Sequence, residues 1–233
     1  MDRETMDREA MDRETMDREA MDRETMLNEY FVKTESRDKK TNFYDSWSKQ
    51  YEQDMQSLDY LGPAFVGSVL AKLYPGAKED VRILDVAAGT GLVGEQLAKQ
   101  GFIRVDALDP SEGMLIEAKS KNVYQALICS YFDEKELDIA PDTYDAVVIC
   151  GACNNSHLPC ECLWEVIRLV KPGGYFVMAT RPSLLESVEE YKGHFEPLMD
   201  EIEKEGKWKK ISREIVSDYH KGKEGIVFVY QMK

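Results

Sequence analysis

The chain has 233 residues, of which 43% are hydrophobic, and its formal net charge is −14. This length suits one α/β domain with a full core, and no apolar run approaches the roughly 18 residues that a membrane-spanning helix needs. We therefore expect no membrane among its partners. A surface this acidic repels phosphate backbones, so we expect no nucleic acid among them unless a local basic patch exists. The chain begins Met-Asp-Arg-Glu rather than with a basic and then an apolar stretch, so we expect no secretory signal and a cytoplasmic protein.

The first 25 residues are a tandem repeat of five pentads, which alternate Met-Asp-Arg-Glu-Thr with Met-Asp-Arg-Glu-Ala. A five-residue period carries the methionines around a helix instead of aligning them, so the segment offers no apolar face to a core. Glu and Arg four residues apart would support a solvated single helix. We therefore expect 1–25 to be a low-complexity segment, disordered or a solvated helix, that cofactor binding does not need. We expect 26–233 to form a single domain.

From about residue 41, helical periods alternate with short apolar runs. Helices are expected at 42–57, 63–73, 92–99, 111–119, 160–170 and 184–205. Strands are expected at 81–86, 103–108, 124–129, 146–150, 175–180, 209–219 and 225–231. Strands separated by helices imply crossovers and a parallel sheet covered on both faces, whereas the last two strands have no helix between them and should pair antiparallel. The pattern predicts a doubly wound α/β fold with a mostly parallel seven-stranded sheet and an antiparallel C-terminal edge strand.

A glycine-rich turn follows the first expected strand, in the run Ile83-Leu84-Asp85-Val86-Ala87-Ala88-Gly89-Thr90-Gly91-Leu92-Val93-Gly94. Glycines at a strand-to-helix turn let the backbone approach a ligand closely. Gly89-x-Gly91-x-x-Gly94 matches the dinucleotide fingerprint, and Asp109 stands 18 residues after Gly91, where a ribose-binding acid belongs. The turn therefore admits a nicotinamide-dependent oxidoreductase or an S-adenosylmethionine-dependent methyltransferase, while a turn used only for packing would leave Asp109 unexplained.

Charge separates the two cofactors. A pyrophosphate on the glycine turn would be repelled by Asp85, which stands just before it, whereas S-adenosylmethionine carries a sulfonium and an ammonium that a carboxylate attracts. Tyr131 and Lys135 imitate the Tyr/Lys pair of some reductases, but they follow the third strand, too early for that family. The chain also has no length left for a separate substrate domain. These observations favour the methyltransferase.

The five cysteines raise the question of a metal site. Cys150-x-x-Cys153 and Cys160-x-Cys162 bring four thiols together in the sequence. Their spacing fits no common structural zinc site, and Cys150 ends an apolar run that reads as a buried strand. We expect reduced thiols and no metal.

Several motifs resemble those of class I S-adenosylmethionine-dependent methyltransferases. The run from Asp85 to Gly91 resembles their first motif, and Leu108-Asp109-Pro110-Ser111-x-x-Met114-Leu115 resembles their second. Lys171-Pro172-Gly173-Gly174 is similar to the turn before their fifth strand. Over residues 41–233, segments such as Phe43 to Trp47 and Tyr144 to Ala152 are similar to the methyltransferase-like family named after the Williams–Beuren syndrome region. Ala87 departs from the pattern, because many relatives have glycine there, and alanine should be tolerated if its backbone angle is ordinary.

The resemblance implies S-adenosylmethionine as the cofactor and gives roles to individual residues. Asp109 would accept hydrogen bonds from the ribose hydroxyls, while Pro110 and Met114 would line the adenine. The remaining cofactor-binding residues that it implies are Tyr44, Tyr51, Asp85, Ala87, Gly89, Thr90, Gly91, Cys129, Ser130, Cys150 and Gly151. Tyr44, Trp47 and Tyr51 also have the spacing of an ordinary core-facing helix stripe, so packing and cofactor contact both stay open for them.

Methyl transfer from a sulfonium needs aligned reactants and little water, and it needs a general base only if the acceptor arrives protonated. His157, in the loop after the expected strand 146–150, is the candidate base, although a lone loop histidine is also typical of a structural role. This loop lacks an Asn-Pro-Pro-aromatic signature, which argues against methylation of nucleic-acid bases. Residues 181–205 mix apolar and acidic side chains and are expected to cover a pocket for a small organic acceptor. A catalytically silent binder of S-adenosylmethionine stays open as an alternative, and the oligomeric state is not determined.

Overall fold

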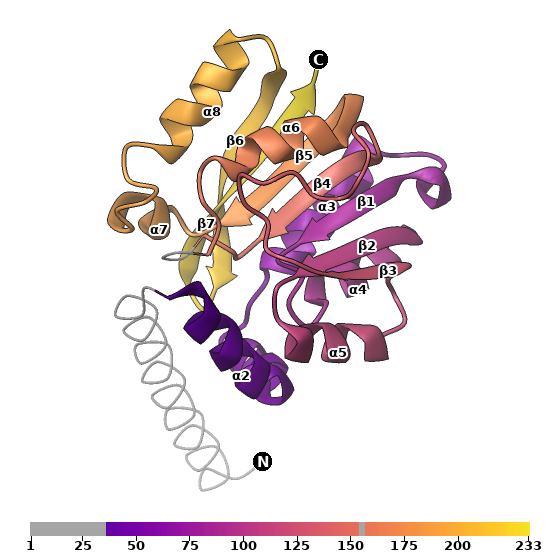
Figure 1. Cartoon of the computed structure of the whole chain (residues 1–233), viewed down its shortest axis with the longest axis vertical. Helices are drawn as coiled ribbons and strands as arrows, with labels where there is room; N and C mark the ends of the chain where they lie inside the picture. The colour runs from indigo at the N-terminus through magenta and orange to yellow at the C-terminus, as the bar shows by residue number, and fades with distance from the viewer. Residues whose placement is uncertain (1–35, 154–156) are drawn as a thin grey trace, which may run out of the picture.

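The structure, a computed structural model, describes residues 36–153 and 157–233 and contains one seven-stranded sheet (Figure 1). Its strands are β1 (Arg82–Val86), β2 (Arg104–Asp109), β3 (Ala126–Cys129), β4 (Tyr144–Cys150), β5 (Val170–Thr180), β6 (Trp208–His220) and β7 (Lys223–Met232). Their order is β3-β2-β1-β4-β5-β7-β6. The first five strands run parallel, and β7 pairs antiparallel with both β5 and β6. The predicted doubly wound, mostly parallel fold is confirmed. The pentad repeat lies outside the described residues.

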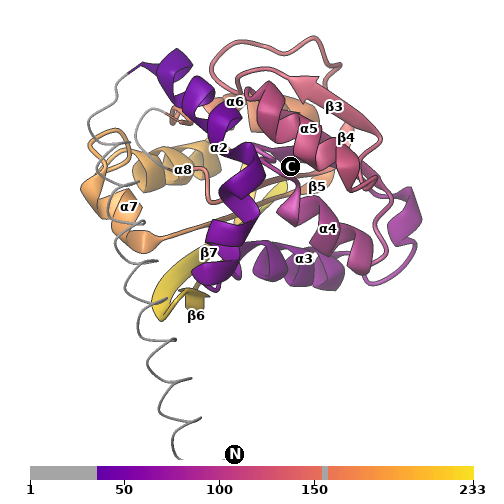
Figure 2. The ribbon, with the colours of Figure 1, turned by 90° about the horizontal axis from the view of Figure 1, so that it is seen from below.

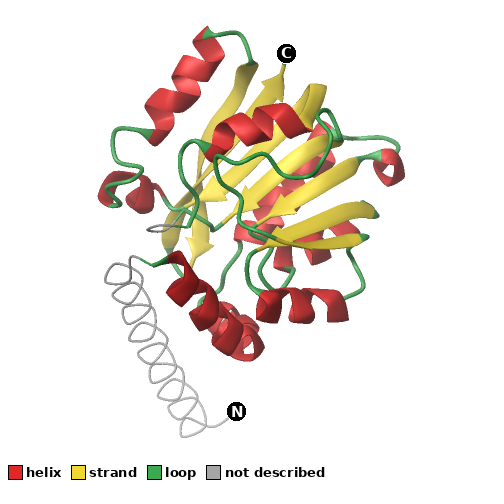
Figure 3. Ribbon diagram, viewed as in Figure 1, coloured by secondary structure: helices red, strands yellow, loops and turns green. Residues whose placement is uncertain are grey.

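Helices cover both faces of the sheet (Figure 2, Figure 3). They are α2 (Arg37–Ser57), α3 (Gly62–Leu73), α4 (Leu92–Lys99), α5 (Glu112–Ser120), α6 (Cys162–Leu169), α7 (Pro182–Ser187) and α8 (Phe195–Lys204), with a short 3₁₀ turn η1 (Lys78–Asp80). The helices α3, α4 and α5 lie on one face, and α6, α7 and α8 lie on the other. No helix in the described parts of the chain has the length and apolar character needed to cross a membrane.

The central strands are apolar on both sides because each side packs against a helix layer. In β1, Ile83 joins the cluster that includes Val66 of α3 and Leu97 of α4. Its neighbour Leu84 points the other way and joins the cluster that includes Val166 of α6. This double burial explains why the parallel strands read as continuous apolar runs, and it fixes the ends of the strands where the turns of the site begin.

The two C-terminal strands are not equivalent, although both were expected at the edge. In β7, consecutive residues Val227, Phe228 and Val229 are all buried, so this strand lies inside the sheet between β5 and β6. In β6, Ile211 and Ile215 are exposed, so this strand forms the edge. The chain thus completes its sheet by inserting the last strand rather than by adding it outside.

The single helix expected over 184–205 is wrong, because α7 ends at Ser187 and α8 begins at Phe195. Gly193, between them, has φ +68°, a left-handed conformation that a helix cannot continue through. Tyr191 in the same interval is buried and donates its hydroxyl to the Leu158 carbonyl at 2.8 Å, which fixes the break by a tertiary contact.

Other boundaries shift by a few residues. The helix α2 begins five residues earlier than expected, at Arg37, where Ser36 is the N-cap and accepts a hydrogen bond from the Lys39 amide. The helix α6 is shorter than expected, and β5 starts at Val170 instead of residue 175. The extension contains the Lys171–Gly174 turn, where the pairing with β4 is irregular.

Candidate functional site

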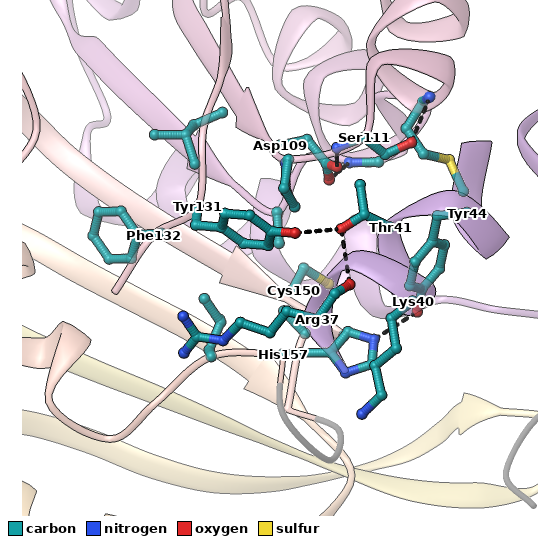
Figure 4. A pocket seen from close by; sticks show the side chains of 18 of the residues that line it. Arg37, Lys40, Thr41, Tyr44, Asp109, Ser111, Tyr131, Phe132, Cys150 and His157 are labelled. Carbon is teal, nitrogen blue, oxygen red and sulfur yellow. Dashed lines mark hydrogen bonds between the residues drawn. The ribbon is translucent and has the colours of Figure 1, made fainter. Parts of the chain in front are cut away.

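A pocket lies beneath α2, at the carboxyl ends of β1, β2 and β4 (Figure 4). It holds about 800 Å³ of empty space, including the part open to solvent. In the order β3-β2-β1-β4, the connection that leaves β1 leads to β2 on one side and the connection that leaves β4 leads to β5 on the other, so a crevice opens between the two connections at the carboxyl ends of these strands. Ligands of open α/β sheets bind at such a crevice.

The glycine turn after β1 forms one wall of the pocket with its backbone. Gly91 is the N-cap of α4 at φ +93°, and Gly89 has φ +56°. A Cβ at Gly89 would meet nothing within 4 Å, so the turn faces open space where a ligand can approach. Ala87 also has a left-handed φ of +54°, so the ordinary angle on which its tolerance depended is not present. This conformation costs an L-residue roughly 1–2 kcal/mol.

Asp109 ends β2 and holds the glycine turn against the start of α5. Its Oδ2 accepts the Gly89 amide at 2.8 Å, and its Oδ1 accepts the Ser111 amide at 2.9 Å. Burial, which leaves 7% of the residue exposed, raises the pKa of Asp109 to about 6, although these two hydrogen bonds act to lower it. Each carboxylate oxygen has a second lone pair, so Asp109 can still accept from a ligand in the pocket that it lines.

Asp85 lies beneath the glycine turn and is 1% exposed. Its Oδ2 accepts the Tyr124 hydroxyl at 2.6 Å, whereas its Oδ1 has no hydrogen-bond partner among the described residues. Burial raises the pKa of Asp85 to about 7, with a further increase from the charge of Asp109 and a decrease from the Tyr124 hydrogen bond. The hydroxyl of Thr90 in the same turn is also buried and lacks a partner in the described structure. Unsatisfied buried oxygens at this position fit a ligand that brings positive charge and hydrogen-bond donors.

The helix α2 covers the pocket and is held by side chains from three distant segments. The Tyr44 hydroxyl pairs with His157 Nε2 at 2.9 Å, and the Thr41 hydroxyl pairs with that of Tyr131 at 2.9 Å. Asp45 Oδ1 accepts both the Ser111 hydroxyl at 2.6 Å and the Gly113 amide at 2.9 Å. These bonds fix α2 to the loops after β3 and β4 and to the first turn of α5.

Of the three aromatic residues that the sequence analysis singled out on α2, two line the pocket and one does not. Tyr44 and Tyr51 line the pocket, and burial raises the pKa of both phenols well above the ordinary value. Trp47 does not line it, and its indole N–H donates to Asp54 Oδ2 at 2.6 Å. Periodicity alone could not make this division, because all three residues have the same helical spacing.

The end of β4 supplies the third wall. Cys150 Sγ lies 3.2 Å from the Tyr60 hydroxyl, and burial raises the pKa of this thiol to about 12, so it is neutral at physiological pH. Gly151 has φ +72°, and a Cβ there would collide with the Tyr60 hydroxyl. The backbone of β4 can therefore turn sharply into the pocket only at a glycine.

The pocket brings together most of the residues that the sequence singled out. Those that line it are Tyr44, Tyr51, Ala87, Gly89, Asp109, Pro110, Met114, Cys150, Gly151 and His157. The other five predicted residues do not line it: Asp85, Thr90 and Gly91 lie in or under the glycine turn, and Cys129 and Ser130 lie at the end of β3. Asn154 to Ser156, between Cys153 and His157, lie outside the described residues.

Sequence reasoning missed Arg37, Lys40, Thr41, Tyr131 and Phe132, which also line the pocket. Tyr131 was noted only as half of a reductase-like Tyr/Lys pair, and no motif marks the other four. Arg37 to Thr41 precede the helix that was expected over 42–57. All five cysteines are free thiols, and across residues 36–153 and 157–233 no group of three or more His, Cys, Asp or Glu side chains is arranged to hold a metal.

Comparison with known proteins agrees with this geometry. A family model described as a methyltransferase domain matches residues 84–178, from β1 into β5. Human methyltransferase-like protein 27 is 36% identical over 170 residues, which are 73% of this chain and 68% of the human protein. The demethylmenaquinone methyltransferase of Renibacterium salmoninarum is 40% identical over 104 residues, but the match spans only 45% of this chain and 43% of that enzyme.

A solved structure shows the same fold at low sequence identity. The magnesium protoporphyrin IX methyltransferase of Synechocystis, crystallised with bound S-adenosylmethionine, has a TM-score of 0.58 and 18% identity, covering 90% of this chain and 96% of that chain. The sheet order, the glycine turn and these matches define a class I methyltransferase whose cofactor is S-adenosylmethionine. The oxidoreductase that the glycine fingerprint alone allowed is thereby set aside.

The chain belongs to the methyltransferase-like family of human protein 27, the Williams–Beuren region protein whose motifs the sequence resembles.

Proposed function

We propose that this methyltransferase transfers the methyl group of S-adenosylmethionine to a small organic acceptor bound beneath α2. The observation that carries the proposal is the shape of the site: a pocket of about 800 Å³ covered by a helix, rather than an open groove. A concave pocket beneath a covering helix is typical of sites that bind a cofactor and a small molecule. The match to a demethylmenaquinone methyltransferase, whose name states a small-molecule substrate, supports the same class of acceptor.

The pocket offers a matching place for each part of the cofactor. Asp109 would accept the ribose hydroxyls, and Pro110 and Met114 would line the adenine, with Cys129 and Ser130 at its outer edge. Asp85, whose Oδ1 lacks a partner among the described residues, would attract the cationic amino-acid end, directly or through water. The amides of the turn from Ala87 to Gly91 would face its carboxylate, and Cys150 and Gly151 would lie beside the methionine chain.

When bound, the cofactor supplies a methyl group on a positively charged sulfur, which departs as a neutral thioether and needs no acid. The chain's own contribution is then to hold the acceptor in line and to exclude water. Tyr44 and Tyr51 on α2 contribute to both tasks, because their half-buried rings line the pocket. A rigid cover favours catalysis, because a small misplacement of the acceptor lowers the rate of methyl transfer strongly.

We propose His157 as the base for an acceptor that arrives protonated. It lines the pocket, and its Nε2 is within hydrogen-bond distance of the Tyr44 hydroxyl. If Tyr44 donates this bond, the Nε2 lone pair is occupied and becomes available only when an acceptor proton displaces the phenol. Tyr44 therefore also fixes the orientation of the imidazole ring before the acceptor binds.

The decisive test is an assay with methyl-labelled S-adenosylmethionine against a pool of small metabolites and, separately, against macromolecules from a lysate. We expect label in the small-molecule pool, and label confined to macromolecules would contradict the proposed acceptor class. Cofactor binding by calorimetry without transfer to either pool would identify a silent binder. Once an acceptor has been identified, His157→Ala should lower kcat by roughly 100-fold and leave cofactor affinity unchanged. An unchanged kcat would show that the proton is released to water instead.

A further inference from the structure

The charges that line the pocket are opposite in balance to those of the whole chain. The protein has 44 acidic residues against 30 Lys and Arg. Of the described residues that line the pocket, however, Asp109 is the only acid, whereas Arg37 and Lys40 are both basic. The balance of charge in the pocket is therefore a local feature that the overall acidity does not explain.

The acidic and the basic residues of the pocket also lie on different sides of it. Asp109 and Ser111 lie on one side of the pocket, and Arg37, Lys40 and His157 lie on the other (Figure 4). Asp85 lies beneath the glycine turn, on the side of Asp109. The acidic side is the one that fits the cationic cofactor, so the basic side is left for the part of the pocket that the acceptor would occupy.

Arg37 is held in place by contacts with the segment that follows β3. Arg37 Nη1 donates to Asp133 Oδ2 at 3.1 Å, and its guanidinium lies 5.8 Å from the centre of the Tyr131 ring. A guanidinium has five N–H donors in a planar fork, so one bond to Asp133 leaves donors for a second carboxylate. Arg37 can therefore bind an anion without releasing its partner.

Lys40 is only 3% exposed, which is unusual for a lysine. Glu190, in the interval between α7 and α8, raises its pKa, but burial lowers it by more, so the net pKa lies below the ordinary value. The attraction of Glu190 thus does not fully offset the loss of water around the ammonium. An additional negative charge in the pocket would stabilise it.

We propose that the methyl acceptor carries a carboxylate, which binds on the basic side of the pocket where Arg37 and Lys40 supply the positive charge. The apolar body of the acceptor would pack against Phe132 and Leu158, which line the same pocket. This inference rests on the proposed small-molecule function and narrows it to a substrate class.

The test uses the full chain saturated with S-adenosylhomocysteine and two matched probes, 3-phenylpropanoate and 3-phenylpropanamide. The probes share one skeleton and differ in charge, so the ratio of their Kd values, measured by calorimetry, isolates the carboxylate. We expect the acid to bind at least about tenfold more tightly than the amide. Arg37→Gln and Lys40→Gln should each reduce this preference several-fold and leave the Kd of S-adenosylhomocysteine unchanged.

Lys49→Gln is the matched control, because Lys49 lies on the same helix but is exposed and does not line the pocket. Lys49→Gln should leave the preference for the acid over the amide unchanged. Equal binding of acid and amide, no binding of the acid at millimolar concentration, or an equal loss in the Lys49 variant would each overturn the proposal. Failure of the wild-type chain to bind S-adenosylhomocysteine is a separate result, which would remove the proposed function and this inference with it.

Discussion

The two halves of the pocket are built in different ways. The half around the glycine turn is made of backbone in unusual conformations, at Ala87, Gly89 and Gly91, and is held by Asp109 from the next strand. The half beneath α2 is made of side chains from segments that are distant in sequence, such as Tyr44 and His157. The first half is a local structure that a short motif specifies. The second exists only when the whole domain is folded.

The difference predicts how substitutions in each half should affect cofactor affinity and stability. Changes in the glycine-turn half should alter cofactor affinity directly, because Asp109 and the backbone of the turn line the pocket. Changes at the contact that docks α2 on α5, where Gly113 lies against Asp45, should act through the position of the helix, so stability and cofactor binding should fall together. The following four predictions test this contrast.

Removing the Asp109 carboxylate should have the largest effect. Asp109→Ala deletes a charged acceptor and releases the Gly89 and Ser111 amides, so we expect about 2 kcal/mol of lost cofactor binding, roughly 30-fold in Kd. Asp109→Asn, which keeps one amide oxygen, should lose less. Calorimetry with S-adenosylhomocysteine measures both variants, and an unchanged Kd in the alanine variant would show that the ribose is held elsewhere.

Adding a methyl group at the contact between α2 and α5 should have the second-largest effect. A Cβ at Gly113 would lie 2.7 Å from the Cα of Asp45, and this backbone cannot move aside as a flexible side chain can. After allowance for the better helix propensity of alanine, Gly113→Ala should lower the free energy of unfolding by roughly 1–2 kcal/mol and weaken cofactor binding too. Gly76→Ala, where a Cβ meets nothing within 4 Å, is the control in denaturant titrations. Equal stability of the two variants would argue against a docked α2.

The glycine-turn half should also respond to pH. Burial raises the pKa of Asp85 to about 7, and only the ionised form attracts a cation, so affinity for S-adenosylmethionine should rise about tenfold between pH 6 and pH 8. Asp109, with a pKa of about 6, adds about twofold over the same interval. The free energy of unfolding depends on pH with the opposite sign. Between about pH 4 and pH 7 the folded chain keeps a proton on Asp85 that the unfolded chain loses. The contribution of this group to stability therefore falls as the pH rises through that interval.

Asp85→Asn provides the control for this pH dependence. The variant shares any titration of the ligand itself and should keep only the small part that Asp109 supplies. Binding isotherms at three pH values compare the two proteins. An equally steep rise in the variant would mean that a group other than Asp85 titrates.

Relief of backbone strain should give the smallest effect. Ala87→Gly removes the penalty of a left-handed alanine but adds entropy to the unfolded chain, so a net stabilisation of about 0.5–1 kcal/mol is expected. Ala88 has no positive φ, and Ala88→Gly should instead destabilise the protein by a similar amount. Thermal unfolding of the pair measures both signs. Destabilisation in both variants would show that the Ala87 methyl group contributes packing that outweighs its strain.

The sequence by itself determined the parts of this protein that depend on neighbours along the chain. The apolar strand runs, the glycine turn after β1 and the position of Asp109 after β2 are local patterns, and they identified the fold and the cofactor class. The break inside the helix expected over 184–205 was not determined in this way: Gly193 is visible in the sequence, but the break also depends on the burial of Tyr191.

Only the tertiary structure decided how α2 contributes to the site. Tyr44, Trp47 and Tyr51 repeat at one helical spacing, yet the fold directs the two tyrosines into the pocket and the tryptophan toward Asp54. Arg37 and Lys40 carry no motif, and their place beside the pocket follows from bonds to residues about ninety or more positions away, such as Thr41 to Tyr131. Periodicity specifies which face of a helix is apolar, but contacts between distant segments fix what that face lies against.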